Sequence, residues 1–435
     1  MTTARASPPS SLVVAATSGA LLAGALVASG APAWLSALLL ALLFLLPPAP
    51  TTTLPSALTV ATSVALLGAH GHTLWRVMAS NVVQVPEWDF PVFWIHARLA
   101  AHGVDFYDPD AAREVAAAFK ASPRFLSQGR FWNPPQSMLL FLPLGWFDDI
   151  RRAYTAWYVV QCGALVGSAA LLWRHLAPGT GARGLLAVAA LTLALPPTLT
   201  TFFVGQSNFL VLLLLLLGWR HRERALGGVW LCLGILVKPI LLLVVLEPLL
   251  RRRKELLAGL LGTFLVMTLL ALMAFGPDVM LGYLQRGAGA VPDEMYRMTV
   301  NQSLLAVLAR AGLVGEGGRP VLSPVFLLCA LSLLGLTAWR LRQPPHDDDD
   351  TLALALVTSL ALLLYPQTLD HYAVLLLVPL VLLWRMHTHA TTALALLVLA
   401  LTTWFPWAGS VPSLFLAFAV AFAGMLWLAR LKPTA

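Results

Sequence analysis

Long apolar runs that recur along the whole chain limit what this sequence can fold into more than any other feature. A helix of roughly 20 apolar residues crosses the hydrocarbon core of a bilayer, where every backbone N–H and C=O must be bonded within the protein. Apolar runs near this length return between residues 11 and 428, separated by short polar links. The pattern predicts an all-α polytopic membrane protein with about 12–14 transmembrane helices.

Composition supports the membrane class and argues against a nucleic-acid-binding protein. Only 11% of the 435 residues are charged and 59% are hydrophobic, whereas soluble domains carry about 25% charged residues. The net charge of +8 would suit nucleic acid in a soluble chain, but Lys and Arg in a membrane protein mark the cytoplasmic ends of spans. We therefore expect the lipid bilayer as a partner, and no nucleic acid.

The cysteines and histidines show no pattern typical of a metal site. The three cysteines all lie in apolar runs, where cysteine behaves as a small buried hydrophobic residue, and they give no disulfide framework. His70, His72 and His96 lie near one face but lack the spacing of zinc ligands. We predict no metal site and no cofactor.

The distribution of basic residues predicts how the spans are oriented. If the N-terminus is cytoplasmic and the spans alternate, nearly all Lys and Arg of the short links fall on the cytoplasmic side. The exception in a short external link is Lys238. An acidic run at 347–350 falls in a cytoplasmic link, and we expect a solvated linker there. The cytoplasmic basic residues are Arg174, Arg183, Arg220, Arg222, Arg224, Arg251, Arg252, Arg253, Lys254, Arg340, Arg342, Arg385, Arg430 and Lys432.

Two long segments fall on the external side in this topology. The first contains a proline-broken apolar stretch at 134–147 that is too short to span, so we expect an interfacial or re-entrant helix there. The chain is then divided into N-terminal transmembrane helices (1–78), a first large external loop with interfacial helices (79–150), a transmembrane core (151–275), a second external loop (276–320) and C-terminal transmembrane helices (321–435).

Asp89 is the residue of the first external loop that most suggests chemistry. It stands between Trp88 and Phe90 in an otherwise aromatic and apolar stretch. A carboxylate in such surroundings is costly unless it has a partner or a function. We expect Asp89 to be a general base; the alternative is an ion-paired residue of the loop or the membrane interface.

Four further polar clusters fall on the same external side as Asp89. Each also has a structural explanation: a lysine that reaches the interface, amides that cap or join helices, or a self-satisfied turn. Their convergence on one side favours a site. The clusters are Gly205-Gln206-Ser207-Asn208, Lys238-Pro239, Asn301-Gln302-Ser303 and the segment from Gln367 through Asp370 and His371 to Tyr372.

In these motifs the sequence resembles glycosyltransferase family 87, within the GT-C class of membrane glycosyltransferases. Order and spacing match over roughly residues 80–385. Two positions depart from the pattern of the family: Phe93 stands where Tyr is common, and Leu369-Asp370-His371 replaces a commoner Trp-x-His. The matching pieces are Asp89-Phe90 with Phe93, Arg98, Gly103 and Tyr107-Asp108-Pro109; Asn133-Pro134-Pro135; Gly205 to Asn208; Gly227 to Lys238-Pro239 with the cluster at 251–254; Asn301 to Leu304; and Tyr365-Pro366 through His371.

The resemblance implies a GT-C-type fold whose large external loop carries the catalytic aspartate, here Asp89. It also implies transfer of a sugar, often mannose, from a polyprenyl-phosphate donor to a glycolipid or glycan acceptor. Loss of phosphate needs positive charge, and sugar hydroxyls need amide partners. We therefore predict an inverting reaction with Asp89 and His371 as catalytic residues. The predicted substrate-binding residues are Arg98, Tyr107, Gln206, Asn208, Lys238, Asn301, Gln302 and Asp370.

The expected location is a bacterial inner membrane, with the active site on the external or periplasmic face. Two other functions remain open from the sequence. A transporter or lipid flippase of the cell-envelope pathway would also have many spans and intramembrane polar residues, but it usually shows internal repeats, and none is found here. A non-catalytic scaffold or polymerase partner would give no reason for polar clusters to gather on one side.

Overall fold

The computed structural model describes residues 11–28, 33–48, 53–86, 89–118, 131–286, 293–315, 320–343, 349–404 and 412–429. Within these ranges the chain is almost entirely helical and has no strand; its β pairing is an isolated bridge between Asn301 and Leu369. The all-α class expected from the apolar runs is confirmed.

Three helices precede the first long polar segment: α1 (Ser11–Ala28), α2 (Ala33–Leu45) and α3 (Thr53–Gln84). Small residues let α1 lie close against α3. A Cβ on Gly19 would stand 2.4 Å from the carbonyl oxygen of Ala61, and one on Gly68 would stand 2.6 Å from the Cβ of Ala23. Such close approach at small residues is typical of helix pairs in membranes.

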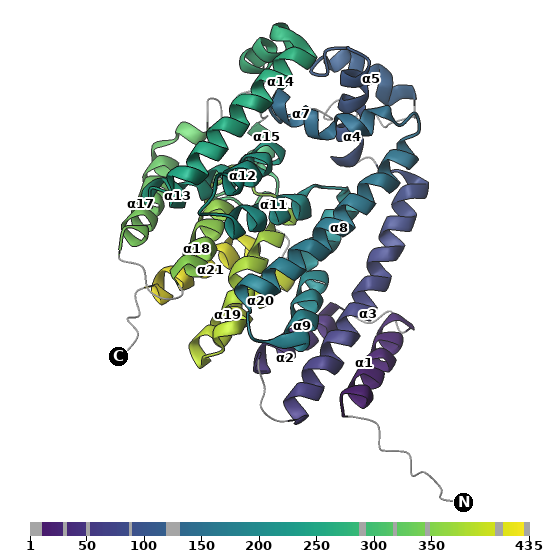
Figure 1. Ribbon diagram of the computed structural model, residues 1–435, viewed down its shortest axis with the longest axis vertical. Coiled ribbons are helices and arrows are strands. Elements are labelled where there is room, and N and C mark those ends of the chain that lie inside the picture. The colour runs from purple at the N-terminus through teal and green to yellow at the C-terminus, as the bar shows by residue number, and fades with distance from the viewer. Residues whose placement is uncertain are drawn as a thin grey trace, which may run out of the picture.

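The first polar segment folds into short helices, which lie together with one end of α14 at the top of Figure 1. The stretch at 134–147 is broken by Pro143 and becomes two pieces, each too short to cross a bilayer. The second piece packs closely against the helix that begins at Asp89. Gly145 allows this contact, because a Cβ at this position would lie 2.2 Å from the carbonyl oxygen of Ala97. The elements are α4 (Asp89–Ala101), α5 (Pro109–Ala118), α7 (Pro135–Phe141) and the 3₁₀ helix η1 (Leu142–Trp146).

The next elements form the core of the bundle. Two breaks in it have clear causes. Pro196 ends one helix, and the two halves meet at 56°, since proline lacks an N–H and restricts the residue before it. Gly276 (φ 80°) and Pro277 kink the longest helix. The elements are α8 (Ile150–Leu176), α9 (Gly181–Ala194), α10 (Pro196–Val204), α11 (Asn208–Arg220), α12 (Ala225–Val237), η2 (Pro239–Val245), α13 (Leu246–Leu250) and α14 (Lys254–Arg286).

The C-terminal elements include the most deeply buried helices of the molecule. Every residue from 353 to 364 is buried, as is every residue from 371 to 384. The centre of the bundle is therefore built from α18, η4 and α19. The elements are α15 (Asp293–Arg297), α16 (Leu304–Arg310), η3 (Pro320–Leu322), α17 (Pro324–Leu341), α18 (Asp349–Leu364), η4 (Asp370–Leu376), α19 (Leu377–Met386), α20 (His389–Trp404) and α21 (Ser413–Leu428).

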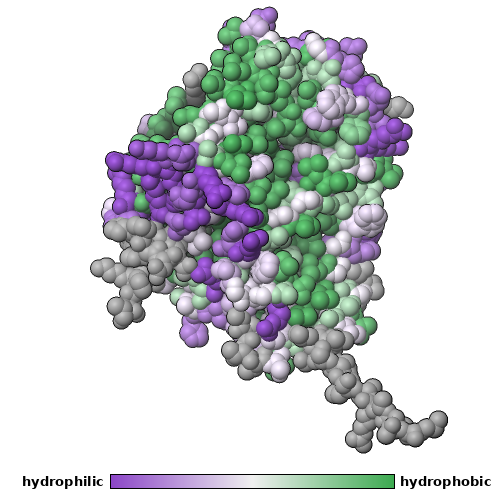
Figure 2. Space-filling model, viewed as in Figure 1, coloured by the Kyte–Doolittle hydropathy of each residue, from purple (hydrophilic) through white to green (hydrophobic). Residues whose placement is uncertain are grey.

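Among the described helices, four are long and apolar enough to cross a membrane, namely α3, α8, α14 and α17, and α9 with α10 adds a fifth if the bent pair is one span. The other apolar helices have 10–17 residues, and a helix of 13 residues is only about 20 Å long. The expected 12–14 spans are reached only if these shorter helices cross as well. Figure 2 shows apolar side chains over most of the visible face, with hydrophilic ones gathered near α13 and α17 and near α5.

Ion pairs join the polar links at one end of the core. We call the residues that form them the charged cluster. They are Arg222, Glu247, Arg251, Arg253 and Asp350. Asp350 accepts hydrogen bonds from Arg222 Nη2 at 2.6 Å and from Arg251 Nη1 at 2.5 Å. Arg253 donates to Asp350 at 3.0 Å and to Glu247 at 2.9 Å.

The expectation of a solvated linker at 347–350 is wrong at Asp350. Its carboxylate binds the guanidinium groups of three arginines from two other links of the chain. Residues 347 and 348 lie outside the described residues.

Candidate active site

Lys238 is the centre of the polar residues that the fold brings together. It ends α12 because Pro239 cannot continue the helix. Only 4% of its surface is exposed. Its Nζ donates to Asn208 Oδ1 at 2.7 Å and lies 3.9 Å from the centre of the Tyr372 ring. The side chain is therefore turned into the protein, where one amide oxygen and one aromatic face compensate its charge.

Asp89 stands at the start of α4, within electrostatic range of this lysine. Its carboxylate is close enough to interact electrostatically with Lys238, Tyr154 and Tyr372. Asp89 is half-buried, and within the described ranges no side chain or backbone group forms a hydrogen bond or ion pair with its carboxylate. It is thus a carboxylate near a cation, without a direct partner. The neighbours Glu87 and Trp88 lie outside the described residues.

The turn from Gly205 to Asn208 is packed directly against α4. Gly205 is left-handed (φ 73°), and a Cβ there would lie 2.6 Å from the Cβ of Phe90 and 2.9 Å from the hydroxyl of Tyr154. Trp157 Nε1 donates to the Gly205 carbonyl at 2.8 Å. The glycine therefore lets the turn approach the residue next to Asp89. Gln206 is half-buried, and its Nε2 donates to no other described residue.

Asn208 connects the lysine to the C-terminal part of the site. Its Oδ1 accepts from Lys238, while its Nδ2 donates to the carbonyl of His371 at 3.0 Å and to Thr201 Oγ1 at 3.1 Å. All the polar atoms of the amide are thereby used within the protein. Asn208 positions Lys238 and His371, and a direct contact with substrate stays a prediction.

His371 is held by the residue before it. Asp370 Oδ1 accepts from the His371 backbone N–H at 2.8 Å and lies 3.4 Å from His371 Nδ1. The ring is buried and lies against Tyr372, with centroids 5.1 Å apart. Within the described residues, Nε2 has no hydrogen-bond partner. The pair thus leaves one imidazole nitrogen without a bond to the described residues, on a ring that packs against Tyr372.

Asn301 and Gln302 build the loop that carries Asp370. The Gln302 backbone N–H donates to the Thr368 carbonyl at 2.7 Å, and Asp370 N donates to Val300 O at 2.9 Å. Their side-chain amides are also bonded to backbone: Asn301 Nδ2 to the Met295 and Pro366 carbonyls, and Gln302 through both ends of its amide. Contact of either residue with a sugar stays a prediction.

Arg98 is separated from Asp89 by nine residues of α4, about 13 Å along the helix axis. Its guanidinium donates to the Phe147 carbonyl and to Asp148, both at 3.2 Å. Asp148 is highly exposed. The structure thus places Arg98 in the last turn of α4, where it binds Phe147 and Asp148 and does not contact Lys238.

Tyr107 reaches the turn at Lys238 indirectly. Its hydroxyl donates to the Asn133 carbonyl at 2.6 Å, and Asn133 Nδ2 donates to the carbonyl of Val237 at 3.2 Å. Burial raises the pKa of Tyr107, so the phenol stays a hydrogen-bond donor at neutral pH. Tyr107 therefore supports the turn from the polar segment between α3 and α8.

Sequence reasoning gave no role to two residues that the fold places here. Tyr372 provides the aromatic face under Lys238. Asn81 lies in α3 and donates to the hydroxyls of Tyr154 and Tyr158, at 3.1 and 2.8 Å. An isolated asparagine near the end of an apolar helix is the signal by which Asn81 could have been found, because such residues join helices in membranes.

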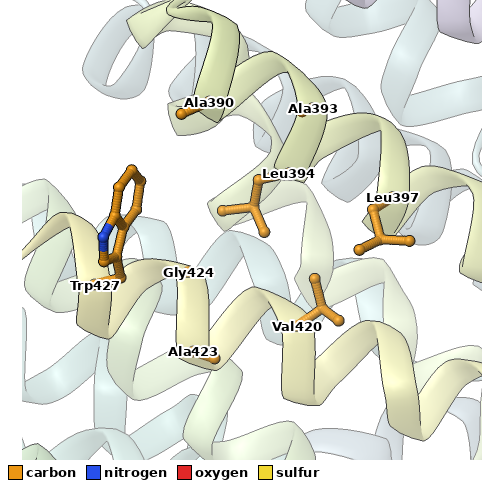
Figure 3. A pocket seen from close by; sticks show the side chains of 8 residues that line it. All are labelled: Ala390, Ala393, Leu394, Leu397, Val420, Ala423, Gly424 and Trp427. Atoms are coloured by element: carbon orange, nitrogen blue, oxygen red, sulfur yellow. The ribbon is translucent and has the colours of Figure 1, made fainter.

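In the described part of the chain, no three His, Cys, Asp or Glu side chains are placed to hold one metal ion. A groove of about 440 Å³ lies between α20 and α21, but none of its lining residues belongs to the clusters above. Figure 3 shows that alanine, leucine, valine and glycine line it, with Trp427 at one end.

Comparison with known proteins gives one match. The model of glycosyltransferase family 87 matches residues 131–366, more than half of the chain. Gln206, Lys238 and Asn301 lie inside this range, Asp370 and His371 lie just beyond it, and Asp89 precedes it. No curated protein and no solved structure matches the chain.

Proposed function

Since the chain belongs to glycosyltransferase family 87, we propose that it transfers a sugar from a polyprenyl-phosphate donor to a lipid or glycan acceptor outside the cell membrane. The membrane helices and the family make it a membrane glycosyltransferase. The donor, the acceptor and the external face are the proposed parts. Mannose is the sugar that the resemblance implies.

The observation that supports this reaction best is the proximity of Asp89 and Lys238. The buried Lys238 side chain lies within electrostatic range of a carboxylate that has no direct partner among the described residues. A polyprenyl-phosphate donor brings one phosphate and one sugar, so it needs a cation on one side and a base on the other.

In the proposed reaction, the acceptor hydroxyl oxygen attacks the anomeric carbon from the face opposite the phosphate. Asp89 takes the hydroxyl proton as the new C–O bond forms. The bond between the anomeric carbon and the phosphate oxygen breaks, and its electron pair leaves with the polyprenyl phosphate. Lys238 stabilises the charge that develops on the phosphate. A single displacement of this kind inverts the anomeric configuration.

His371 is proposed to act on the phosphate side. Among the described residues its Nε2 is buried without a hydrogen-bond partner, and Asp370 lies beside the Nδ1 edge of the ring. An N–H at Nε2 can donate a hydrogen bond to a phosphate oxygen. Gln206 has an amide nitrogen available to a sugar hydroxyl. Asn208, Asn301 and Gln302 then act by positioning, because their amides are used within the protein.

The test is a reaction with purified protein, polyprenyl-phospho-mannose and a crude acceptor lipid fraction. The expected result is a glycosylated lipid whose anomeric configuration, read by NMR, is opposite to that of the donor. A retained configuration would overturn the single displacement. A flippase of the cell-envelope pathway would instead move the donor across the membrane of a vesicle and leave it intact. Consumption of the donor therefore separates the two functions.

A further inference from the structure

The charged cluster and Lys238 lie at opposite ends of the same helices. Arg222 belongs to the link between α11 and α12. Glu247 lies in α13, and Arg251 and Arg253 lie in the link between α13 and α14. Asp350 stands at the start of α18. Helices that meet at the cluster therefore lead away from it toward Asn208, Lys238 and the segment before Asp370.

The cluster is more than a set of surface ion pairs. Glu247 is fully buried, and the side chain of Arg253 is 9% exposed. Asp350 is one-third exposed and receives three guanidinium groups. Burying such charges costs free energy that their attraction only partly returns, so a buried ion network is weak evidence for stability and fits a role in register better.

Two antiparallel elements connect the cluster to the site. From Lys238, η2 and α13 run about 21 Å to Arg251, at the rises of 3₁₀ and α helices. From Asp350, α18 runs about 21 Å to Leu364, just before the segment that holds Asp370, His371 and Tyr372. η2 packs along α18. At one end the pair is joined by Arg251 and Asp350, and at the other by Lys238 and Tyr372.

We propose that the charged cluster is a positioning device for the donor site. Asp350, through Arg251 and Arg253, fixes the register of η2 and α13 against α18. That register sets where Lys238 stands relative to Tyr372 and His371 at the other end. The inference rests on the proposed function, because it takes Lys238 as the group that meets the donor phosphate.

The device predicts that a change on the far side of the bundle acts on donor binding. Asp350→Asn keeps the shape of the side chain and removes its charge. We expect the KM for polyprenyl-phospho-mannose to rise about tenfold, below the roughly hundredfold that a misplacement of 1 Å can cost, with kcat changed less. Asp350→Glu restores the charge and should recover much of the donor KM.

Glu223→Gln is the matched control. Glu223 also pairs with Arg253, but it is 69% exposed and belongs to neither η2, α13 nor α18. Its loss should leave the donor KM unchanged. If Asp350→Asn gives no folded protein, Arg251→Gln is the second variant, because Arg253 still pairs both Glu247 and Asp350; it should raise the donor KM by a smaller factor.

Direct binding of polyprenyl phosphate separates the two ideas. If the unmodified protein does not bind polyprenyl phosphate, the proposed function fails. If it binds and folded Asp350→Asn binds equally well with the same KM, the positioning device is overturned. The positioning device would also be overturned if Asp350→Asn and Asp350→Glu raised the donor KM equally, or if kcat fell and the donor KM did not change.

Discussion

Asn208 Oδ1 accepts a 2.7 Å hydrogen bond from Lys238 Nζ, and the other end of the same amide bonds the carbonyl of His371. One asparagine thus fixes the lysine and the histidine relative to one another. Three segments that are distant in the sequence meet in this contact. The amide also explains how an ammonium is held in an apolar surrounding without a directly bonded carboxylate.

Asp89→Asn tests the general base. The substitution keeps the size and the hydrogen-bonding groups of the side chain but removes its basicity. We expect kcat to fall about 100- to 10,000-fold, while donor binding largely survives because Lys238 is unchanged. Asp148→Asn, in the same external segment and highly exposed, should keep the normal rate. A near-normal rate for Asp89→Asn would pass the base role to Asp370 or Glu87.

Lys238→Met tests the phosphate contact. Methionine keeps much of the apolar stem and removes the charge. Donor binding should weaken by about 1.5–3 kcal/mol, as expected for a hydrogen bond to a charged group. This corresponds to a rise in Kd of about ten- to a hundredfold. The control is Lys254→Met, at an exposed position beside the charged cluster. Unchanged donor affinity in Lys238→Met would remove Lys238 from the site.

Gly205→Ala tests the contact between the turn and α4. Gly103 has nearly the same left-handed backbone, at φ 71°, but open space around it. Gly103→Ala should therefore cost only the backbone term, about 1–2 kcal/mol. Gly205→Ala adds a collision with Phe90 and Tyr154, worth about 1–3 kcal/mol more. Thermal unfolding in detergent measures both, and equal losses would contradict the packing described.

Cysteine labelling tests the proposed orientation in the membrane. The three native cysteines are replaced by alanine, and single cysteines are introduced at Asp110 and Arg224, both exposed. A reagent that cannot cross membranes should label position 110 in intact cells and should reach position 224 only after the membrane is opened. The reverse pattern would put the candidate site on the cytoplasmic side.

Sequence patterns predicted the parts of the site better than their roles. The single lysine of a short external link and the turn at Gly205 stand out because charge and glycine are rare in apolar runs. Whether an amide is available for substrate depends on backbone partners from other segments. Asn301 therefore looked like a sugar ligand, although its amide bonds Met295 and Pro366.

The contacts of Asp350 and the lengths of the individual helices could not be read from the sequence, because both depend on the fold. Asp350 stands in a polar, proline-containing link, and only the fold brings three arginines to it. Proline and 3₁₀ turns divide several apolar runs into pieces that are short for a bilayer. A count of apolar runs therefore exceeds the number of helices that are long enough to cross on their own.

The burial of α18 bears on the order in which the protein is made. This helix has no lipid-facing side over residues 353–364, and it leaves the ribosome after η2, α13 and α17, which pack against it. Until it enters, the arginines at 222, 251 and 253 lack Asp350, and Lys238 lacks the face of Tyr372. A nascent chain that stops before residue 349 would hold a bundle with an open centre. Catalytic competence would then arrive only with about the last fifth of the chain.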